Sequence, residues 1–237
     1  MARIFSQRSS VPDLEAQKAA AAAKALELVE AGQVIGIGTG STARYFIEGL
    51  GKLVKQGLDV KVVPTSAATE ALAVSLRIPV LDDFTGTIHL AVDGADEIDP
   101  QLRIIKGAGG ALTREKLVAC AAQKFIIIAD GSKLVEQLGR GVLPVEVIPF
   151  LWQRTAERLA ALGAEYALRG TPSEPFVTDN GNLILDLLFP NGIEDPEVLD
   201  VQLNEAVGVV EHGLFIDIAD ACIVADADSV RILGSLS

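Results

Sequence analysis

One segment of the chain places anion-binding groups beside a carboxylate. Lys106 opens a run of small residues that includes Gly107, Gly109 and Gly110, and Glu115 follows in the first turn of an expected helix. Glycines allow tight turns and a close approach of backbone to ligand, and free N–H groups of such a loop and of a helix N-terminus bind anions. Lys106 adds a positive charge, and Glu115 could move a proton. This combination suits a reaction that converts a carbon acid through an anionic intermediate.

Glu115 has two interpretations. It shares a helix face with Val118 and Ala122, three and seven residues further on. A carboxylate in line with an apolar stripe loses water, which raises its pKa toward the range that suits a general base. In the alternative, Glu115 complements the helix dipole, with Arg114 and Lys116 solvated beside it. When Glu115 is considered alone, the helix-dipole interpretation is favoured.

A second glycine-containing segment, residues 36–42 (GIGTGST), joins a short apolar strand to a helix. Such junctions bind ligands in α/β sheets, and Gly40 with the hydroxyls of Thr39, Ser41 and Thr42 could hold a phosphate or sugar oxygens. The segment has neither the third glycine of the dinucleotide fingerprint nor the Gly-Lys-Ser/Thr ending of a P-loop. The alternative is a tight turn in which Thr42 is the helix N-cap.

Acidic residues follow another buried strand, in the sequence Asp93-Gly-Ala-Asp96-Glu97. Asp93 and Asp96 could act as acid–base groups or bind sugar hydroxyls. A Mg²⁺ site, or a turn capped by Asp93, are the alternatives. Lys18, Lys106 and Lys133 are candidates for holding an anion, although a lone lysine is usually solvated.

Composition limits the classes of function. Of the 237 residues, 49% are hydrophobic, which predicts a full core, and no apolar run is long enough for a transmembrane helix. Residues 1–11 lack the apolar region of a secretory signal. The net charge of −12 argues against nucleic acid or an acidic membrane as partner, but it permits a small phosphorylated substrate.

Cysteine and histidine usage points to a reducing compartment, and hence to the cytoplasm, without a metal site. Cys120 and Cys222 lie in apolar segments and are expected to be buried thiols. His89 and His212 lie far apart, with no cysteine or histidine at ligand spacing, so a zinc site is not expected.

The first half of the chain alternates helical and strand-like segments, which predicts an α/β domain built on a largely parallel sheet with helices on both faces, as in Rossmann-like folds. The expected helices are 14–30, 43–55, 66–76 and 112–123, and the expected strands are 33–37, 60–63, 78–81, 88–92, 102–105 and 125–129.

After Lys133 the pattern changes to a smaller α+β unit. We expect an α/β catalytic domain from residues 1–138 and 214–237, and a small domain from residues 139–213. The expected segments of the second half are helices 149–162 and 196–207 and strands 145–148, 165–169, 183–188, 209–211 and 221–225, the last returning to the first sheet.

Together, the motifs resemble the A-type ribose-5-phosphate isomerases. The resemblance runs from about Leu14 to near the C-terminus. It is carried, in order, by residues 38–42 (GTGST), 64–66 (PTS), 93–97 (DGADE), 106–116 (KGAGGALTREK), 143–149 (LPVEVIP), 177–182 (VTDNGN) and 208–215 (GVVEHGLF). Each motif alone is weakly specific, whereas the ordered set is highly specific.

The resemblance implies cofactor-free interconversion of D-ribose 5-phosphate and D-ribulose 5-phosphate, a step of the non-oxidative pentose phosphate pathway. Glu115 matches the base that moves a proton between C2 and C1. Lys106 and the glycine-run N–H groups match the part that stabilises the enediolate oxygens. Asp93 matches a group that assists ring opening and hydroxyl proton transfer, and Asp96 a sugar-hydroxyl contact. Substrate contacts are expected from Lys18, Thr39, Gly40, Ser41, Thr42, Asp93, Gly94, Ala95, Asp96, Lys106, Gly107, Ala108, Gly109 and Lys133.

The resemblance also implies a homodimer or homotetramer, with the small domain at the interface. The chain departs from the family where Ala108 replaces a common glycine, which matters if that position needs a positive φ, and where residues 206–208 (AVG) replace Ile-Pro-Gly.

Three other functions are weighed against the isomerase. An amino-sugar-phosphate deaminase is expected to use a histidine, and neither histidine lies in a candidate motif. A coenzyme A transferase would form a covalent adduct on a glutamate. A sugar-phosphate-sensing module of a transcription regulator needs a basic helix-turn-helix segment, for which the acidic chain leaves no room.

Overall fold

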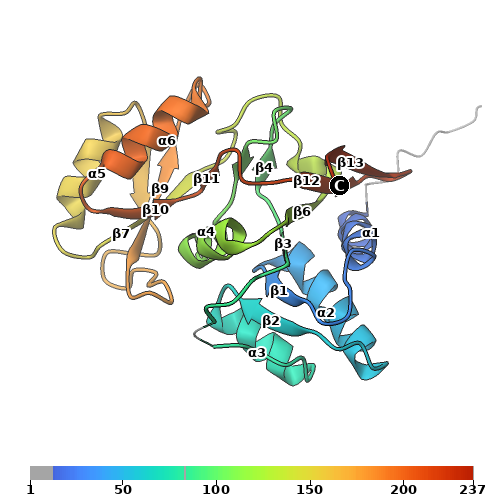
Figure 1. Ribbon diagram of the computed structural model, residues 1–237. Coiled ribbons are helices and arrows are strands. Elements are labelled where there is room, and N and C mark those ends of the chain that lie inside the picture. The colour runs from blue at the N-terminus through green and yellow to red at the C-terminus, as the bar shows by residue number, and fades with distance from the viewer. Residues whose placement is uncertain (1–12, 83, 237) are drawn as a thin grey trace, which may run out of the picture.

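The computed structural model describes residues 13–82 and 84–236, and the prediction for the first eleven residues lies outside them. The main sheet has the strand order β13-β12-β6-β3-β1-β2 (Figure 1). All its pairings are parallel except that of β12 with β13. This confirms the α/β fold with a largely parallel sheet. The strands are β1 (Val34–Ile37), β2 (Lys61–Pro64), β3 (Leu90–Asp93), β6 (Phe125–Asp130), β12 (Ala221–Ala225) and β13 (Val230–Gly234).

Helices cover both faces of this sheet. Successive side chains of a strand point to opposite sides, so a strand with apolar residues at every position presents an apolar surface to each layer of helices. In β6, Ile126 and Ile128 pack in the core that contains α1 (Leu14–Leu26), α2 (Ser41–Lys55) and α3 (Ala67–Ser75). Ile127 of the same strand packs in a separate core with residues of α4 (Leu112–Ala121). The alternating cores hold α4 against the face opposite α1–α3.

A second sheet, with the order β10-β7-β9-β8, is antiparallel and lies with α5 and α6 at the other end of the molecule (Figure 1). Trp152 packs against its core. These elements are β7 (Leu143–Val147), β8 (Glu165–Leu168), β9 (Leu183–Leu188), β10 (Val209–His212), α5 (Trp152–Ala160) and α6 (Pro196–Glu205).

A small three-stranded sheet, ordered β11-β5-β4, completes the fold. Its strands are β4 (Glu97–Ile98), β5 (Ile104–Ile105) and β11 (Leu214–Phe215), and the turn η1 (Gly131–Lys133) follows β6. Because β5 leads directly into Lys106 and β11 pairs with it, this sheet fixes the start of the glycine-containing loop. None of the helices in the described ranges combines the length and hydrophobicity that a membrane span requires.

Some expected boundaries were wrong. Residues 78–81 contribute an isolated bridge between Val62 and Val80 instead of a strand. The first helix ends at Leu26, and α5 begins only at Trp152, after Leu151 in a left-handed conformation. Residues 221–225 do return to the first sheet, as predicted, but β13 beside them was not expected.

The prediction that both thiols are buried was also wrong. Cys222 is buried in β12, whereas Cys120 is exposed. In α4, the neighbouring Ala119 faces the sheet. One residue further along a helix turns the side chain by roughly 100°, which puts Cys120 on the solvent side although its sequence neighbours are apolar.

Candidate active site

The candidate site lies where the carboxyl ends of β1 and β3 meet. β1 pairs with β2 on one side and β3 on the other, which makes this the point where the strand order changes direction and where open α/β sheets bind ligands. The Gly38 N–H donates to the Val92 carbonyl, 2.9 Å away. A Cβ at Gly38 would stand 1.9 Å from Asp93 Oδ1, so only glycine lets the two strand ends approach this closely.

The N-terminus of α2 is open toward this site. Gly40, with φ +127°, is the N-cap and supplies no side-chain acceptor to the helix. The alternative in which Thr42 caps the helix is therefore wrong, since the helix already begins at Ser41. The first N–H groups of a helix have no intrahelical partner and carry the positive end of its dipole. This end of α2 can therefore receive an anion.

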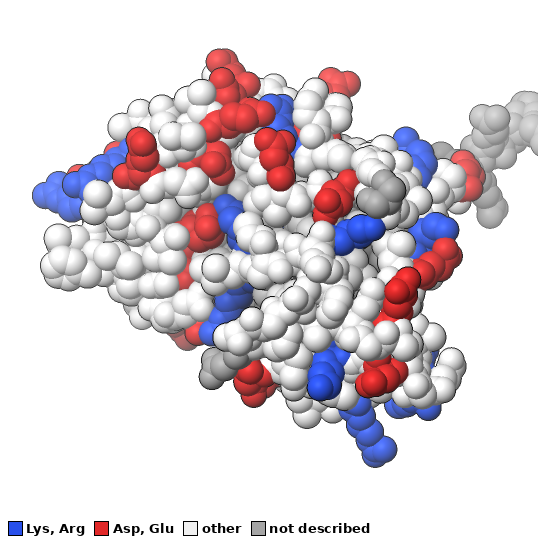
Figure 2. Space-filling view, in the orientation of Figure 1, with Lys and Arg blue, Asp and Glu red and all other residues white. Residues whose placement is uncertain are grey.

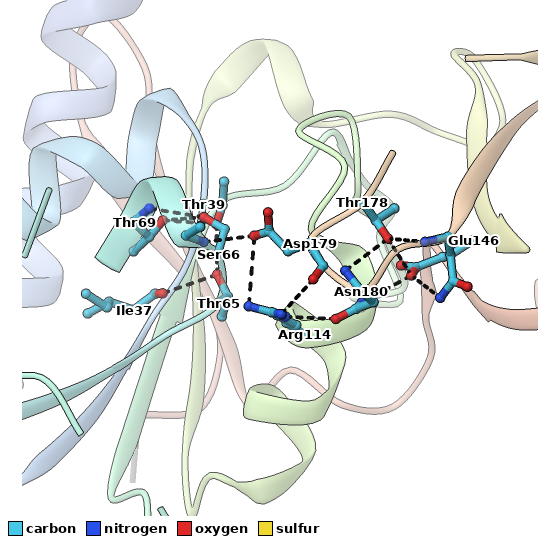
Figure 3. A network of polar contacts seen from close by, with 12 residues as sticks. Ile37, Thr39, Thr65, Ser66, Thr69, Arg114, Glu146, Thr178, Asp179 and Asn180 are labelled. Atoms are coloured by element: carbon cyan, nitrogen blue, oxygen red, sulfur yellow. Dashed lines mark hydrogen bonds and ion pairs between the residues drawn. The ribbon is translucent and has the colours of Figure 1, made fainter. Parts of the chain in front are cut away.

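A cluster of four hydroxyl groups, from Thr39, Thr65, Ser66 and Thr69, fixes the loop between β1 and α2 (Figure 3). The Thr39 hydroxyl lies 2.9 Å from Thr65 Oγ1, 2.8 Å from Ser66 Oγ and 3.0 Å from Thr69 Oγ1. Thr69 Oγ1 in turn donates to the Gly38 carbonyl. The Thr39 hydroxyl is thus held by α3 and the segment before it, while Ser41 and Thr42 have no hydroxyl bond of this kind within the described residues.

The loop between β5 and α4 forms a tight turn at the cavity. Gly110 N–H donates to Gly107 O, and both glycines have a positive φ, of 82° and 103°. Ala108 is not among the described residues with a positive φ, so its methyl group is compatible with the turn. The Ala108 N–H donates to Asp96 Oδ2, 2.9 Å away. Asp96 thus holds this loop as well as facing the cavity.

Three charged side chains meet at the floor of the site. Lys106 Nζ lies 2.9 Å from Asp93 Oδ2 and 3.2 Å from Glu115 Oε2, and it donates to the Gly94 carbonyl. All three residues are 3% exposed. Asp93 Oδ1 accepts from the Gly94 and Thr39 N–H groups. One lysine therefore faces two carboxylates, so the cluster carries an excess negative charge when both are ionised.

Burial shapes the protonation of this cluster. Burial first, and the charge of Asp93 second, raise the pKa of Glu115 to about 8. Burial also raises the pKa of Asp93, against the opposing effect of Lys106. Burial opposes the charge on Lys106, but the two carboxylates outweigh it and raise the Lys106 pKa above its usual value. The lysine stays charged while Glu115 can take up and release a proton near neutral pH.

A cavity of about 240 Å³ opens above the cluster. Asp93 lies beneath it, in contact with Lys106. Lys18 does not line it, and its ammonium pairs with Glu15 at 2.7 Å. Every other residue expected to contact substrate does line it, together with Glu115: Thr39, Gly40, Ser41, Thr42, Gly94, Ala95, Asp96, Lys106, Gly107, Ala108, Gly109 and Lys133.

A polar network, which sequence reasoning missed, holds the start of α4 against the second sheet (Figure 3). Glu146 of β7 is fully buried and accepts from the Thr113 hydroxyl at 2.6 Å and the Thr178 hydroxyl at 2.9 Å. It also accepts from the side-chain amides of Asn180 and Asn182. Because Thr113 lies two residues before Glu115, this network fixes the helical turn that carries the carboxylate.

Arg114 and Asp179 extend the network to α3. The Arg114 guanidinium donates to Asn180 Oδ1 and to the Asp179 carbonyl. Asp179 Oδ2 accepts from the Ala67 N–H at the start of α3. The turn at residues 178–182 therefore joins the start of α3 to the start of α4. Its sequence, with four polar side chains around Gly181, is typical of an ordinary turn and gives no signal of these contacts.

A second cavity, of about 310 Å³, lies beside α6 and is lined by residues such as Phe189, Ile193 and Val198. Its lining contains no lysine, arginine or histidine. The described residues hold no cluster of three metal-ligating side chains. This second cavity therefore offers no cationic side chain to an anion.

Comparisons with known proteins agree with these motifs. The family described as "Ribose 5-phosphate isomerase A (phosphoriboisomerase A)" matches residues 61–229. The ribose-5-phosphate isomerase A of Parvibaculum lavamentivorans is 51% identical, over 92% of this chain and 97% of its own. That of Thermococcus kodakarensis is 47% identical, over 92% and 98%.

Solved structures give the same result. The ribose 5-phosphate isomerase from Plasmodium falciparum superposes with a TM-score of 0.90 and 37% identity, over 94% of this chain and all of its own. A D-ribose-5-phosphate isomerase in complex with phospho-erythronic acid also gives a TM-score of 0.90, at 43% identity over 94% of this chain and all of its own. The chain therefore belongs to the ribose 5-phosphate isomerase A family of isomerases.

Proposed function

We propose that this isomerase interconverts D-ribose 5-phosphate and D-ribulose 5-phosphate through an enediolate, with Glu115 as the base. The observation that carries the proposal is the contact of buried Glu115 with Lys106, 3.2 Å apart at the floor of a polar cavity. A carboxyl of raised pKa accepts a proton from carbon at neutral pH, and a fixed cation beside it stabilises the oxyanion that forms.

The proposed proton path conserves every atom. In the open-chain aldose, Glu115 takes the proton from C2, the C2–H electron pair forms the C1=C2 bond, and the carbonyl oxygen becomes an oxyanion. Lys106 and the loop N–H groups stabilise that oxygen. Glu115 then returns the proton to C1, while the O2 proton moves to O1 with the help of Asp93, leaving a carbonyl at C2. Asp93 also assists opening of the sugar ring.

The phosphate anchor is proposed to lie at the N-terminus of α2. The open N–H groups near Ser41 and Thr42 face the cavity, and Lys133 from the turn after β6 adds a charge. A site for the non-reacting phosphate fixes C1 and C2 over Glu115 by remote binding energy. A relative has been solved in complex with phospho-erythronic acid, which also carries a phosphate, and this supports a phosphorylated ligand for the proposed site.

The histidines favour the isomerase over a deaminase. His89 Nδ1 accepts from the Val34 N–H, and neither histidine lines the cavity. The proposal includes the pentose phosphate pathway and a cytoplasmic location. The division into residues 1–138 with 214–237 and residues 139–213, and a homodimer or homotetramer formed through the small domain, stay predictions.

A coupled assay for ribulose 5-phosphate in the presence of EDTA tests the function. Wild-type protein is expected to turn over, and Glu115→Gln to lose at least about 100-fold in kcat, the usual effect of removing a general base. Glu165→Gln, at an exposed position of β8, is the matched control and should retain full activity. No turnover by folded wild-type protein would overturn the function, and turnover that survives in Glu115→Gln would remove Glu115 from the base role.

A further inference from the structure

Arg169 lies directly after β8 and reaches the loop at the active-site cavity. Its Nη1 donates to the Gly107 carbonyl and to the Ala108 carbonyl, each 3.1 Å away. Arg169 does not line the cavity itself. It contacts the loop from the side of the second sheet, more than 60 residues away in sequence.

The guanidinium is held rigidly in this position. Asp186 of β9 binds it through two oxygens, one to Nε at 2.9 Å and one to Nη2. The guanidinium carbon lies 5.8 Å from the centre of the Phe176 ring. That ring covers Gly110, since a Cβ there would stand 2.5 Å from Phe176 Cζ. A planar, bidentate-bound and stacked arginine cannot be replaced by the point charge of a lysine without loss of geometry.

The two carbonyl contacts determine where the loop N–H groups point. In a planar trans peptide, the carbonyl of one residue and the N–H of the next point in opposite directions. The Gly107 carbonyl faces Arg169, so the Ala108 N–H points away, and it does reach Asp96 on the cavity side. By the same rule the Gly109 N–H points away from Arg169. It has no acceptor among residues 13–82 and 84–236, and Gly109 lines the cavity.

We propose that Arg169 is a positioning residue that orients the peptide N–H group of Gly109 toward the oxyanion of the reaction intermediate, while Asp96 holds the N–H group of Ala108. This inference rests on the proposed function. A donor that is aimed in advance at developing charge stabilises the transition state more than the substrate. The guanidinium also polarises both peptide groups through their carbonyls, which strengthens the N–H groups as donors. Asp186 and Phe176 keep it in place.

Kinetics of Arg169→Met, Arg169→Lys and Asp186→Asn test the proposal. Loss of one oxyanion donor lowers kcat by about 100- to 1000-fold, so misorientation by Arg169→Met should lower kcat by at least about tenfold, with little change in KM. Arg169→Lys keeps the charge and should lose nearly as much. Asp186→Asn keeps the guanidinium but holds it less firmly, so its kcat should lie between that of wild type and that of Arg169→Met. Arg154→Met, at an exposed position of α5, controls for the change in net charge.

Binding separates orientation from a structural effect. The affinity for phospho-erythronic acid should fall in parallel with kcat/KM in Arg169→Met and Arg169→Lys, while inorganic phosphate should bind as in wild type. In NMR spectra, this acid should shift the Gly109 amide signal in wild type and shift it much less in the variants. Thermal melts test whether each variant is folded. If Arg169→Met does not fold, the kinetics of Arg169→Lys decide the test.

Two results would overturn the inference while leaving the isomerase function intact. One is a kcat within about twofold of wild type in both arginine variants. The other is a rise in KM at unchanged kcat, which would assign Arg169 to ground-state binding. Absence of turnover in wild type is a different outcome, since it contradicts the function itself, and the Gly109 amide signal would then still report whether Arg169 orients the loop.

Discussion

At the scale of single residues, the proposed chemistry depends on Lys106, because this lysine faces both carboxylates at once. Its contacts with Asp93 and Glu115 place three ionisable groups in a site almost closed to water. A buried cation is stabilised only when it is paired, and a second carboxylate beside the same cation is difficult to ionise. Glu115 therefore holds a proton more tightly than an exposed carboxyl does, so that near neutral pH it can both accept and return one, as the proposed transfer between two carbons requires.

The raised pKa of Glu115 predicts a pH-dependent stability. Its carboxyl has a pKa of about 8 in the folded protein and 4.5 in an exposed setting, so between these values the folded protein holds a proton that the unfolded chain has released. Raising the pH through this window therefore favours unfolding, by at most about 1.4 kcal/mol per pH unit. Glu115→Gln cannot ionise, and its free energy of unfolding should fall less between pH 5 and pH 8.

Urea titrations at several pH values measure this slope. Glu165→Gln removes an exposed glutamate and should keep the wild-type slope. Equal slopes in wild type and Glu115→Gln would show that Glu115 ionises normally in the folded protein, and would remove the physical basis for its role as a base.

At the scale of elements, the N-terminal turn of α4 depends on a buried carboxylate that has only neutral donors. Glu146 accepts four hydrogen bonds, from Thr113, Thr178, Asn180 and Asn182. Hydrogen bonds to a charged group each contribute about 1.5–3 kcal/mol to stability. A donor that lost its bond to Glu146 would remain buried without a partner, which is unfavourable. The network joins the second sheet to the helix that presents Glu115.

Glu146→Gln should therefore weaken both folding and catalysis. Its amide NH₂ replaces one acceptor oxygen, and we expect a loss of about 1–3 kcal/mol in the free energy of unfolding. We also expect a lower kcat, because α4 carries Glu115 two residues after Thr113. Urea unfolding and the coupled assay measure the two effects, with Glu165→Gln as control. A variant that is destabilised but keeps the wild-type kcat would show that the network contributes to folding and not to catalysis.

Sequence reasoning recovered the parts of the fold that depend on local pattern. Continuous apolar strands predicted the parallel sheet, and the glycine-containing junctions together with the family resemblance predicted nearly all of the cavity lining. It could not find the two-residue strands β4 and β11, because two residues carry no periodicity, whereas β5 lies inside the expected strand 102–105. Arg169 and Glu146 also gave no signal, since their partners lie far away in sequence and only tertiary packing brings them together.

At the scale of the whole molecule, two sheets with separate cores share one site. Loops of the main sheet supply Asp93 and the proposed phosphate end of the cavity, while the second sheet fixes the loop at Gly107 and the turn before Glu115. Figure 2 shows Lys and Arg interspersed with Asp and Glu over the face in view, so no continuous basic surface draws an anion there. The net charge of −12 also gives an anion no general attraction to the protein, so we expect the cavity residues to supply the affinity of an anionic ligand.

This arrangement predicts that ligand-linked stability depends on a cavity lysine. Phospho-erythronic acid at 100 times its Kd should raise the free energy of unfolding of wild type by about 2.7 kcal/mol, because it binds the folded state alone. If Lys133→Met weakens binding tenfold, the same concentration should add only about 1.4 kcal/mol. Lys61→Met, at an exposed position of β2, should respond as wild type does. Urea unfolding with and without the acid measures these gains, and an undiminished gain in Lys133→Met would place the ligand away from this cavity.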